Sequence, residues 1–433
     1  MSDPESNTKD RALDIHKKYK GKVEIIGKAA LNDNDDLSLF YTPGVAEVSN
    51  AIKSNFEMSY EYTNRANTVA IISDGTRVLG LGDIGPEAGM PVLEGKSMLF
   101  KKFGGVDAIP IEVGSKDEED IIKFAKMIEP SVGAINIEDI EVPKVFRITK
   151  RLKNELKIPV FHDDREGTAI VVRAALMNAL AVVGKKPKSV KIVVNGSGSA
   201  GLGIVEILEA SSIGEMVVCD TAGAIYEGRK NNMNEFKEWI AKTTNRKMET
   251  GDLLNAVKGA DVLIGVSNKG AFTKEMIQQM NKDPIVFALA NPISEIDYND
   301  AKAAGANIVA TGRSDRPNQV NNYLSFPGFF RGMLSSMASK VTDSMVLAAS
   351  DAIASSVKKS QRSADYIIPK FYNLRDYTAL AVRIAVSVAE AAVKSGVART
   401  RFDRDEIKKE TKMLLSRYSK IEKTTDRLNK KYQ

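Results

Sequence analysis

Cysteine and histidine are nearly absent from this sequence of 433 residues, which contains only Cys219, His16 and His162. One cysteine excludes an internal disulfide and a thiolate metal cluster, and we expect it to be a buried residue in a strand. The two histidines argue against a Ser-His-Asp triad and against a His-ligated zinc site. General acid and base chemistry would then fall to lysine, tyrosine, aspartate or glutamate.

Long apolar runs are also missing. The most apolar stretch, 169–183, is interrupted by Arg173 and Asn178, and the sequence begins with polar and acidic residues. We therefore expect no signal peptide, no membrane span and a cytoplasmic location. The length of the chain predicts two domains, each with its own core.

Basic charge is concentrated at one end of the chain. The formal net charge is +6, but residues 401–433 hold 11 Lys and Arg against 6 Asp and Glu, so the preceding 400 residues carry about +1. The apolar spacing of this tail predicts a solvated helix that packs along the body or a partner subunit. A scaffold or nucleic-acid binder that uses the tail is the competing interpretation, although we expect no nucleic-acid partner.

Two pairs of acids follow two short apolar runs. Residues 134–137 precede Glu138 and Asp139, and residues 159–161 precede Asp163 and Asp164. The intervening segment has the apolar spacing of a helix, so the unit is predicted to be strand, helix, strand, with parallel strands.

Neighbouring parallel strands would place these four carboxylates at one edge of a sheet, where open α/β sheets bind ligands. Four negative charges at such a point need either a compensating cation or a raised pKa on one of the carboxyl groups. Mg²⁺ or Mn²⁺ is favoured because hard divalent ions prefer carboxylate oxygen. Capping of the following helices is the alternative role for any single acid.

A glycine-rich turn follows a strand expected at residues 190–194. It contains Gly196, Gly198, Ser199, Ala200 and Gly201, and an apolar helix comes next. Strand, glycine turn and helix in this order predict a dinucleotide site, in which the pyrophosphate lies at the helix N-terminus.

Asp220 lies 19 residues beyond Gly201, at the end of the next expected strand. An acid here binds a ribose hydroxyl and usually indicates NAD, but Arg229 and Lys230 are near enough in sequence to leave NADP open. Further strands are expected at 261–266, 285–290 and 307–310, and helices near 333–358 and 377–397.

Three other residues could take part in chemistry. Tyr41 precedes a Pro-Gly turn, and a buried tyrosine is the alternative to a catalytic one. Arg77, in a glycine-rich loop, could bind a carboxylate or form a surface ion pair. Lys96 begins an apolar helix; burial would lower its pKa and make it a base, whereas a lysine that reaches from a helix end to solvent is the alternative.

Asparagines near the expected strand ends could bind the coenzyme or the substrate. Asn291 either forms a turn or contacts the coenzyme. Asn321 and Asn322 lie in a polar loop and could donate to a carboxylate or a nicotinamide without adding charge.

Several blocks together resemble the malic enzymes, in the short form found in prokaryotes. They are Tyr-Thr-Pro-Gly-Val-Ala from residue 41, Ser-Asp-Gly-Thr-Arg-Val-Leu-Gly-Leu-Gly-Asp-Ile-Gly-Pro from 73, Glu-Gly-Lys-Ser from 94, Ile-Glu-Asp from 137, Phe-His-Asp-Asp from 161, the glycine fingerprint, Ala-Asn-Pro from 290, Gly-Arg-Ser-Asp from 312, Pro-Asn-Gln-Val-Asn-Asn from 317 and Phe-Pro-Gly from 326. The resemblance covers residues from about 12 to about 399.

The resemblance implies oxidative decarboxylation of (S)-malate to pyruvate and CO₂ with NAD or NADP, a divalent metal and a homodimer or higher homo-oligomer. It implies an α/β fold with an N-terminal catalytic domain at 1–164, a Rossmann-type doubly wound domain at 165–399 and a basic helical tail at 400–433. By motif, Lys96 is the base, Tyr41 the acid, Glu138, Asp139 and Asp164 the metal ligands, Asp163 an adjacent acid, Arg77 and Asn321 substrate contacts, and Asn291 a cofactor or substrate contact.

One departure lies beside the expected metal site. Arg165 and Glu166 stand where the family usually has Gln and His, so a charged pair replaces a neutral one. The competing enzyme hypothesis is a metal-independent NAD(P)-linked amino-acid or hydroxy-acid dehydrogenase.

Overall fold

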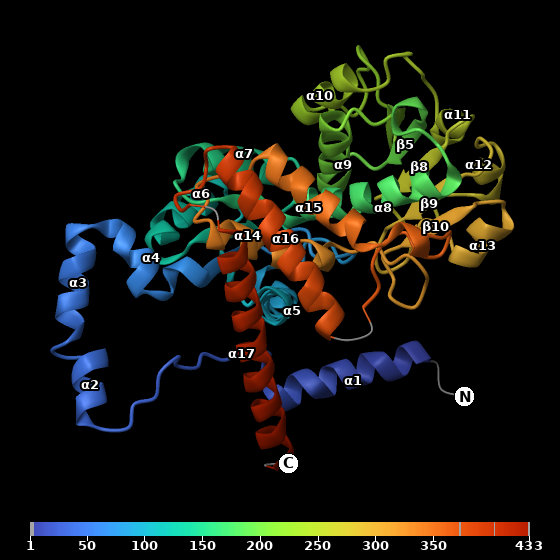
Figure 1. Ribbon diagram of the computed structural model, residues 1–433. Helices are drawn as coiled ribbons and strands as arrows, with labels where there is room; N and C mark the ends of the chain where they lie inside the picture. The colour runs from blue at the N-terminus through green and yellow to red at the C-terminus, as the bar shows by residue number, and fades with distance from the viewer. Residues whose placement is uncertain (1–3, 372–373, 402, 432–433) are drawn as a thin grey trace.

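Two β-sheets organise the chain in a computed structural model that describes residues 4–371, 374–401 and 403–431 (Figure 1). The first sheet has the order β2-β1-β3-β4, and all its pairs are parallel. Its strands are β1 (Thr68–Ser73), β2 (Asp107–Glu112), β3 (Ala134–Ile137) and β4 (Val160–His162). The inner strands β1 and β3 are buried throughout, as expected for parallel strands covered on both faces.

The strand-helix-strand unit predicted from the acid pairs is confirmed. Helix α7 (Lys144–Glu155) connects β3 to β4, and its buried Val145, Ile148 and Leu152 share one face because they recur at helical spacing. The other helices of this region are α4 (Ser59–Tyr62), α5 (Pro86–Gly104) and α6 (Glu118–Ile128). Strand β2 was not predicted; it contains Pro110 and lies at a sheet edge, the position in which a strand tolerates proline.

The second sheet has the order β10-β9-β8-β5-β6-β7, parallel except for the short β7. It confirms the expected Rossmann-type architecture. Its strands are β5 (Lys191–Asn195), β6 (Glu215–Asp220), β7 (Gly223–Ala224), β8 (Val262–Gly265), β9 (Ile285–Ala288) and β10 (Ile308–Thr311). Its helices are α9 (Ser199–Ala210), α10 (Glu235–Thr243), α11 (Leu253–Val257), α12 (Lys274–Gln278) and α13 (Tyr298–Ala303).

Four helices join the two sheets: α8 (Thr168–Val183), α14 (Phe326–Ser335), α15 (Asp343–Ser356) and α16 (Leu374–Lys394). The single helix expected near 333–358 is in fact α14 and α15, because Met337 is left-handed and the Thr342 hydroxyl caps a new N-terminus. Helix α14 packs on α5 and α16, and Phe326 and Phe330 lie 4.6 and 4.9 Å from Phe100 between ring centroids. One hydrophobic core therefore extends through both sheets.

Residues 163–183 are long and apolar enough to cross a membrane, judged by length and composition alone. Within the most apolar window, however, 72% of the residues are buried inside the protein. Arg173 and Asn178, which interrupt the run, are also buried: Arg173 pairs with Asp351, and the Asn178 amide donates to the carbonyl of Ile367. In this structure α8 is a core helix.

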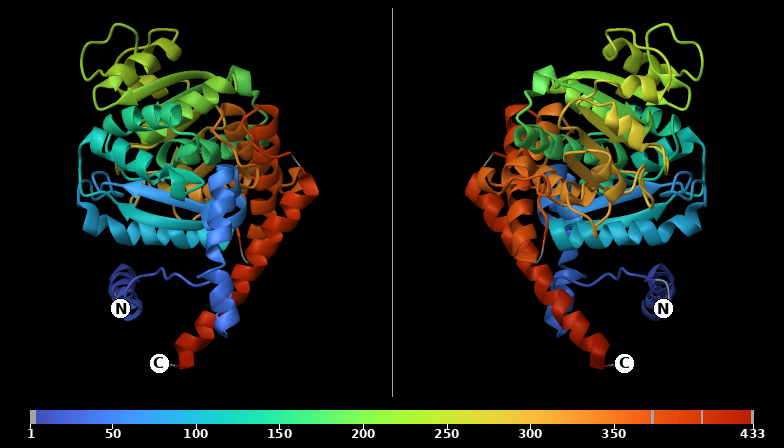
Figure 2. Two further views of the ribbon diagram at one scale, coloured as in Figure 1. Left: turned by 90° about the vertical axis from the view of Figure 1, so that its left-hand side faces the viewer. Right: turned by 90° about the vertical axis from the view of Figure 1, so that its right-hand side faces the viewer.

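The first part of the chain forms an extended arm. It contains α1 (Pro4–Tyr19), α2 (Asn34–Phe40) and α3 (Val45–Ser54), and none of residues 10–59 is buried. Figures 1 and 2 show α2 and α3 standing away from the sheets. We call residues 4–54 the N-terminal arm.

The basic tail forms α17 (Arg404–Lys431), which packs on α5 and α16. Ile407, Thr411 and Leu415 recur every four residues and are buried, so they form the contact face. Lys102 on α5 pairs with Glu422 at 2.7 Å. The expected packing of a solvated helix along the body is confirmed.

We expect the thiol of Cys219 to be unreactive in the native protein. Cys219 is fully buried in β6, and burial, with the nearby charge of Asp220, raises the pKa of its thiol to about 12. Only about one thiol in ten thousand would be ionised at pH 8. Ellman's reagent should label one thiol per chain in guanidinium and label the native protein far more slowly; equal rates would contradict this.

Candidate active site

The two acid pairs meet at one edge of the first sheet. Strands β3 and β4 are neighbours, and Ile137 pairs with His162, so the next residues of both strands emerge together. Glu138, Asp139 and Asp164 each offer a carboxylate oxygen within 4.8 Å of the others. The expected convergence of these side chains is present.

The local backbone holds this cluster. Asp139 is left-handed, with φ of 50°, a conformation that aspartate tolerates better than most residues. Its carbonyl accepts from the Arg77 amide at 2.9 Å, and its own amide donates to Asp164 Oδ2 at 3.3 Å. Asp163–Gly167 forms a single π-helical turn after β4.

The acids are not helix caps. The N-cap of α7 is Pro143 and that of α8 is Gly167, and neither has a side-chain cap. Burial and the charge of Asp164 raise the pKa of Asp139 to about 8, and burial likewise raises that of Glu138. Among the described residues, Asp139 Oδ2 is buried without a hydrogen-bond partner. This donor set fits a hard divalent cation.

Lys96 projects into the cluster from α5. Residues 89, 93, 96, 100 and 104 form the buried face of this helix, so Lys96 is directed inward. Its ammonium group pairs with Glu138 and, at 2.5 Å, with Asp163 Oδ2. The expected fall in the pKa of Lys96 is wrong for this structure: burial lowers it, but the charges of Asp163 and Glu138 outweigh burial and raise it.

Of the two neighbouring asparagines, Asn322 touches the cluster. Its Nδ2 donates to Asp163 Oδ2 at 2.6 Å, whereas Asn321 Oδ1 accepts from the Tyr323 amide and caps a short helix. The sequence placed both residues in one polar loop, and the family resemblance assigned a substrate contact to Asn321 alone. The structure adds Asn322 as a residue that holds Asp163.

Arg77 is exposed beside the cluster, on a turn that a buried ion pair holds in place. Asp74 Oδ2 pairs with Lys144 at 2.7 Å, and Asp74 Oδ1 accepts from the amide and hydroxyl of Thr76. The Thr76 hydroxyl then accepts from the Glu141 amide at 3.0 Å. This network, which the sequence did not reveal, joins the Arg77 turn to the segment after the metal-site acids.

Arg165 and Glu166 are not paired with each other. Arg165 forms an ion pair with Glu206 on α9, while Glu166 pairs with Lys153 on α7 and accepts from the His162 amide. A Cβ on Gly203 of α9 would lie 2.3 Å from the Arg165 carbonyl, so this helix packs tightly on the π-helical turn. Arg165 therefore ties the π-helical turn, which carries Asp163 and Asp164, to α9, and Glu166 ties it to α7.

The glycine turn after β5 has the shape of a phosphate-binding loop. Gly196 has a φ of +126°, and a Cβ on Gly201 would lie 1.9 Å from the Gly196 carbonyl, so both positions require glycine. A Cβ on Gly198 would meet no atom within 4 Å, which leaves open space for a ligand. Ser199 and Ala200 begin α9, whose N-terminus favours an anion.

Asp220 ends β6 as expected, but Arg229 and Lys237 bind its carboxylate. Lys230 is exposed and does not take part in these ion pairs.

The Asn291 amide lies against Gly312, where a Cβ would meet its Nδ2 at 2.8 Å. Glu295, missed in the sequence, is buried and accepts from the Ala290 amide, which fixes the loop that carries Asn291.

Tyr41 does not lie with the other candidates in the same chain. It follows α2 on the N-terminal arm and is 66% exposed, and Figure 1 shows its flanking helices far from α5. The structure gathers Lys96, Glu138, Asp139, Asp163 and Asp164 without it.

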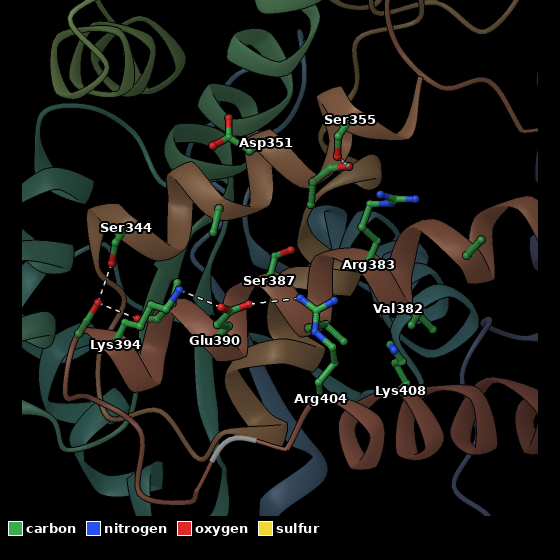
Figure 3. A pocket seen from close by; sticks show the side chains of 16 residues that line it. Ser344, Asp351, Ser355, Val382, Arg383, Ser387, Glu390, Lys394, Arg404 and Lys408 are labelled. Atoms are coloured by element: carbon green, nitrogen blue, oxygen red, sulfur yellow. Dashed lines mark hydrogen bonds and ion pairs between the residues drawn. The ribbon is translucent and has the colours of Figure 1, made fainter. Parts of the chain in front are cut away.

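A groove of about 920 Å³ lies elsewhere, between α15, α16 and α17 (Figure 3). Glu390 pairs there with Lys394 and Arg404. None of the predicted site residues lines it, so it is separate from the acid cluster.

Comparisons with known proteins place the chain in a family. Residues 20–123 match the family described as "Malic enzyme, N-terminal domain", and residues 166–393 match "Malic enzyme, NAD binding domain". The chain belongs to the malic enzyme family. These ranges fall within the predicted domains 1–164 and 165–399, whose boundaries stay predictions.

Individual relatives within the family are similar over nearly the whole chain. A "Bifunctional malic/malolactic enzyme" of Bacillus subtilis (strain 168) is 49% identical over 94% of this chain and 98% of its own length. An "NAD-dependent malic enzyme" of Geobacillus stearothermophilus is 48% identical over 91% of this chain and 80% of its own length. The crystal structure of malic enzyme from Pyrococcus horikoshii Ot3 superposes with a TM-score of 0.92 and 43% identity, covering 98% of this chain and all of that one.

The names of family members do not agree on one coenzyme. Besides the NAD-dependent enzyme, a "Probable NADP-dependent malic enzyme" of Rickettsia prowazekii (strain Madrid E) is 44% identical over 90% of this chain and 52% of its own length. The family therefore supports NAD or NADP.

We expect Lys144→Met to destabilise the protein by about 3–5 kcal/mol, because it would leave Asp74 buried without its cation. The Asp74 side chain is fully buried beneath the Arg77 turn. Urea unfolding measures the change, and Lys150→Met, at an exposed position on the same helix, should change stability by less than about 0.5 kcal/mol. Equal stabilities of the two variants would refute the structural role of the Asp74–Lys144 pair.

Proposed function

We propose that this protein oxidatively decarboxylates (S)-malate to pyruvate and CO₂ with NAD or NADP and a divalent cation, Mg²⁺ or Mn²⁺. The observation that carries the proposal is the position of Lys96, whose ammonium group lies between Glu138 and Asp163 beside three converging carboxylate oxygens. The names of its relatives support the substrate. We also propose a cytoplasmic location, in keeping with a sequence that offers no disulfide.

The acid cluster would hold the cation. Glu138, Asp139 and Asp164 supply the oxygens, and the unpartnered Asp139 Oδ2 fits a coordination bond. A divalent cation held there would supply a Lewis acid that stabilises negative charge on the oxygen atoms of malate. Asn136 donates to Glu138 at 2.9 Å and holds that carboxylate in place.

Once its ammonium group has lost a proton, Lys96 would remove the proton of the C2 hydroxyl. A cation held by Glu138, Asp139 and Asp164 would offset the carboxylate charge that raises the pKa of Lys96 in the protein alone. Asp163 and Asn322 fix the direction of its amine, since Asp163 Oδ2 contacts both. NAD or NADP, held at the glycine turn after β5, would accept the C2 hydride, so malate would lose two electrons and become a β-keto acid. The C3–C4 bond then breaks, CO₂ leaves with C4, and C3 must receive a proton, which Tyr41 would donate.

Substrate binding falls to residues around the cluster. Arg77 is exposed next to Asp139 and can bind a malate carboxylate bidentately. Asn321 lies in the same loop as Asn322 and can donate to the second carboxylate, while Asn291, three residues after the end of β9, would contact the coenzyme or substrate.

Substitution of Lys96 tests the function. We expect Lys96→Ala to lower malate-dependent coenzyme reduction by about 10²–10⁴-fold through loss of the base, while Mn²⁺ binding, followed by electron paramagnetic resonance, persists. Asp164→Asn should weaken Mn²⁺ binding itself. Lys101→Ala, on the same helix and paired with Asp107 outside the cluster, is the matched control.

Malate turnover that survives EDTA, or that releases no CO₂, would favour the metal-independent dehydrogenase and refute this function. Turnover by Lys96→Ala at the wild-type rate would refute the role of Lys96.

The homo-oligomer belongs to the same proposal, because Tyr41 needs a second chain to act. The N-terminal arm exposes Leu39, Phe40 and Tyr41 at 68%, 55% and 66%, an apolar patch that monomers rarely leave uncovered. Lys22 ties the arm to α5 through Glu94 and the Pro91 carbonyl, yet α2 and α3 remain detached. We infer that these helices pack on a second copy and deliver Tyr41 to its acid cluster.

Subunit mixing tests this inference. A hybrid of Tyr41→Phe and Lys96→Ala chains should regain malate oxidation, because the Tyr41→Phe chain keeps its own Lys96 and receives Tyr41 from the other chain. Each variant alone should be impaired, Tyr41→Phe mainly in the steps that require proton transfer at C3. Coexpressed, differently tagged chains provide the hybrid, and a hybrid no more active than its parents would show that Tyr41 acts within its own chain.

A further inference from the structure

The carboxylate of Asp220 is saturated by neighbouring donors. Its Oδ1 accepts from Arg229 Nη1 at 2.9 Å and from the Ala222 amide at 2.8 Å. Its Oδ2 accepts from Arg229 Nη2 at 2.7 Å, Lys237 Nζ at 2.8 Å and Asn232 Nδ2 at 3.1 Å. A carboxylate offers about four lone-pair sites, so five donors leave none free for a ribose hydroxyl.

The charge at this position is positive. The side chains of Asp220, Arg229 and Lys237 are 7%, 4% and 12% exposed, so water screens them weakly. Burial opposes ionisation of Asp220, but its bonds from Arg229 and Lys237 outweigh burial and lower the pKa of the carboxyl. One anion therefore faces two cations, and the group carries a net charge of +1.

This group borders the expected coenzyme site. The Gly196 amide donates to the Cys219 carbonyl at 2.9 Å, which joins the glycine turn to the end of β6. In dinucleotide-binding folds the residue at that strand end lies at the adenosine ribose, where a free acid selects NAD by repelling a 2′-phosphate. Here one cation neutralises the charge of Asp220 and a second positive charge remains, which favours the binding of a phosphate.

Arg229 and Lys237 are held differently. Arg229 also donates to the backbone carbonyls of Gly223, Ala224 and Asn232, so its position is fixed by the chain. Lys237 has one other bond, to the Asn232 carbonyl, and carries its charge on a flexible stem from α10. Lys237 can move to a ligand while Arg229 stays on Asp220.

We propose that Asp220 anchors Arg229 and Lys237 instead of binding the ribose, and that Lys237 binds the 2′-phosphate, so that the protein prefers NADP to NAD. The preference rests on the proposed use of a nicotinamide coenzyme. The phosphate contact can be tested without malate turnover.

Calorimetry of the full chain with 2′,5′-ADP and 5′-AMP isolates the 2′-phosphate. We expect 2′,5′-ADP to bind at least about tenfold more tightly than 5′-AMP, since one charge-assisted hydrogen bond supplies that factor. Lys237→Met should remove most of the difference without changing 5′-AMP binding, and Lys237→Arg should retain it. Lys242→Met, which removes an exposed charge from the same helix, should behave as wild type.

Equal binding of the two nucleotides by the wild type would overturn the proposal, as would equal effects of Lys237→Met and Lys242→Met. Thermal melts of each variant verify that the fold is intact. As a second readout, the ratio of kcat/KM for NADP to that for NAD should exceed one and fall in Lys237→Met. Failure of malate turnover with either coenzyme would refute the proposed function and leave the nucleotide comparison interpretable.

Discussion

The concentration of buried carboxylates around Lys96 is the constraint on which the rest of the site depends. Glu138, Asp139, Asp163 and Asp164 are brought to one sheet edge by two parallel strands, and their mutual repulsion opposes this arrangement. The single positive charge of Lys96 is shared between two of these carboxylates, Glu138 and Asp163. The Asp139 carboxyl, with a pKa raised to about 8, shows how much charge remains uncompensated.

The architecture around this cluster brings together the residues that we propose for the metal, the substrate and the coenzyme. Helix α5 supplies Lys96, the polar loop before α14 supplies Asn322, and the π-helical turn supplies Asp163 and Asp164. That same turn packs on α9, whose N-terminus begins at the glycine loop, and Arg165 ties the two together through Glu206. A shift of α9 would therefore move the turn that carries Asp163 and Asp164.

Much of this followed from local sequence patterns. The apolar runs before the acid pairs predicted β3 and β4, and the spacing of residues 141–157 predicted α7, because burial on one face imposes a helical period. The glycine turn and Asp220 were likewise placed at strand ends. Strand β2 was not predicted because Pro110 weakens the strand pattern. The break between α14 and α15 was not predicted because Met337, Ala338 and Val341 continue the apolar helical spacing across it.

The sequence by itself determined which residue types could do the chemistry, since lysine, tyrosine and carboxylates were nearly all that its composition allowed, and it determined their order along the strands. Only the tertiary structure decided the pKa values of these residues and which residues lie next to them. The charges of Asp163 and Glu138 raised the pKa of Lys96 although burial lowers it, Lys237 reached Asp220 from 17 residues away, and Tyr41 stood apart on the arm. Charges and distances between segments depend on how those segments pack, and spacing along one chain does not encode them.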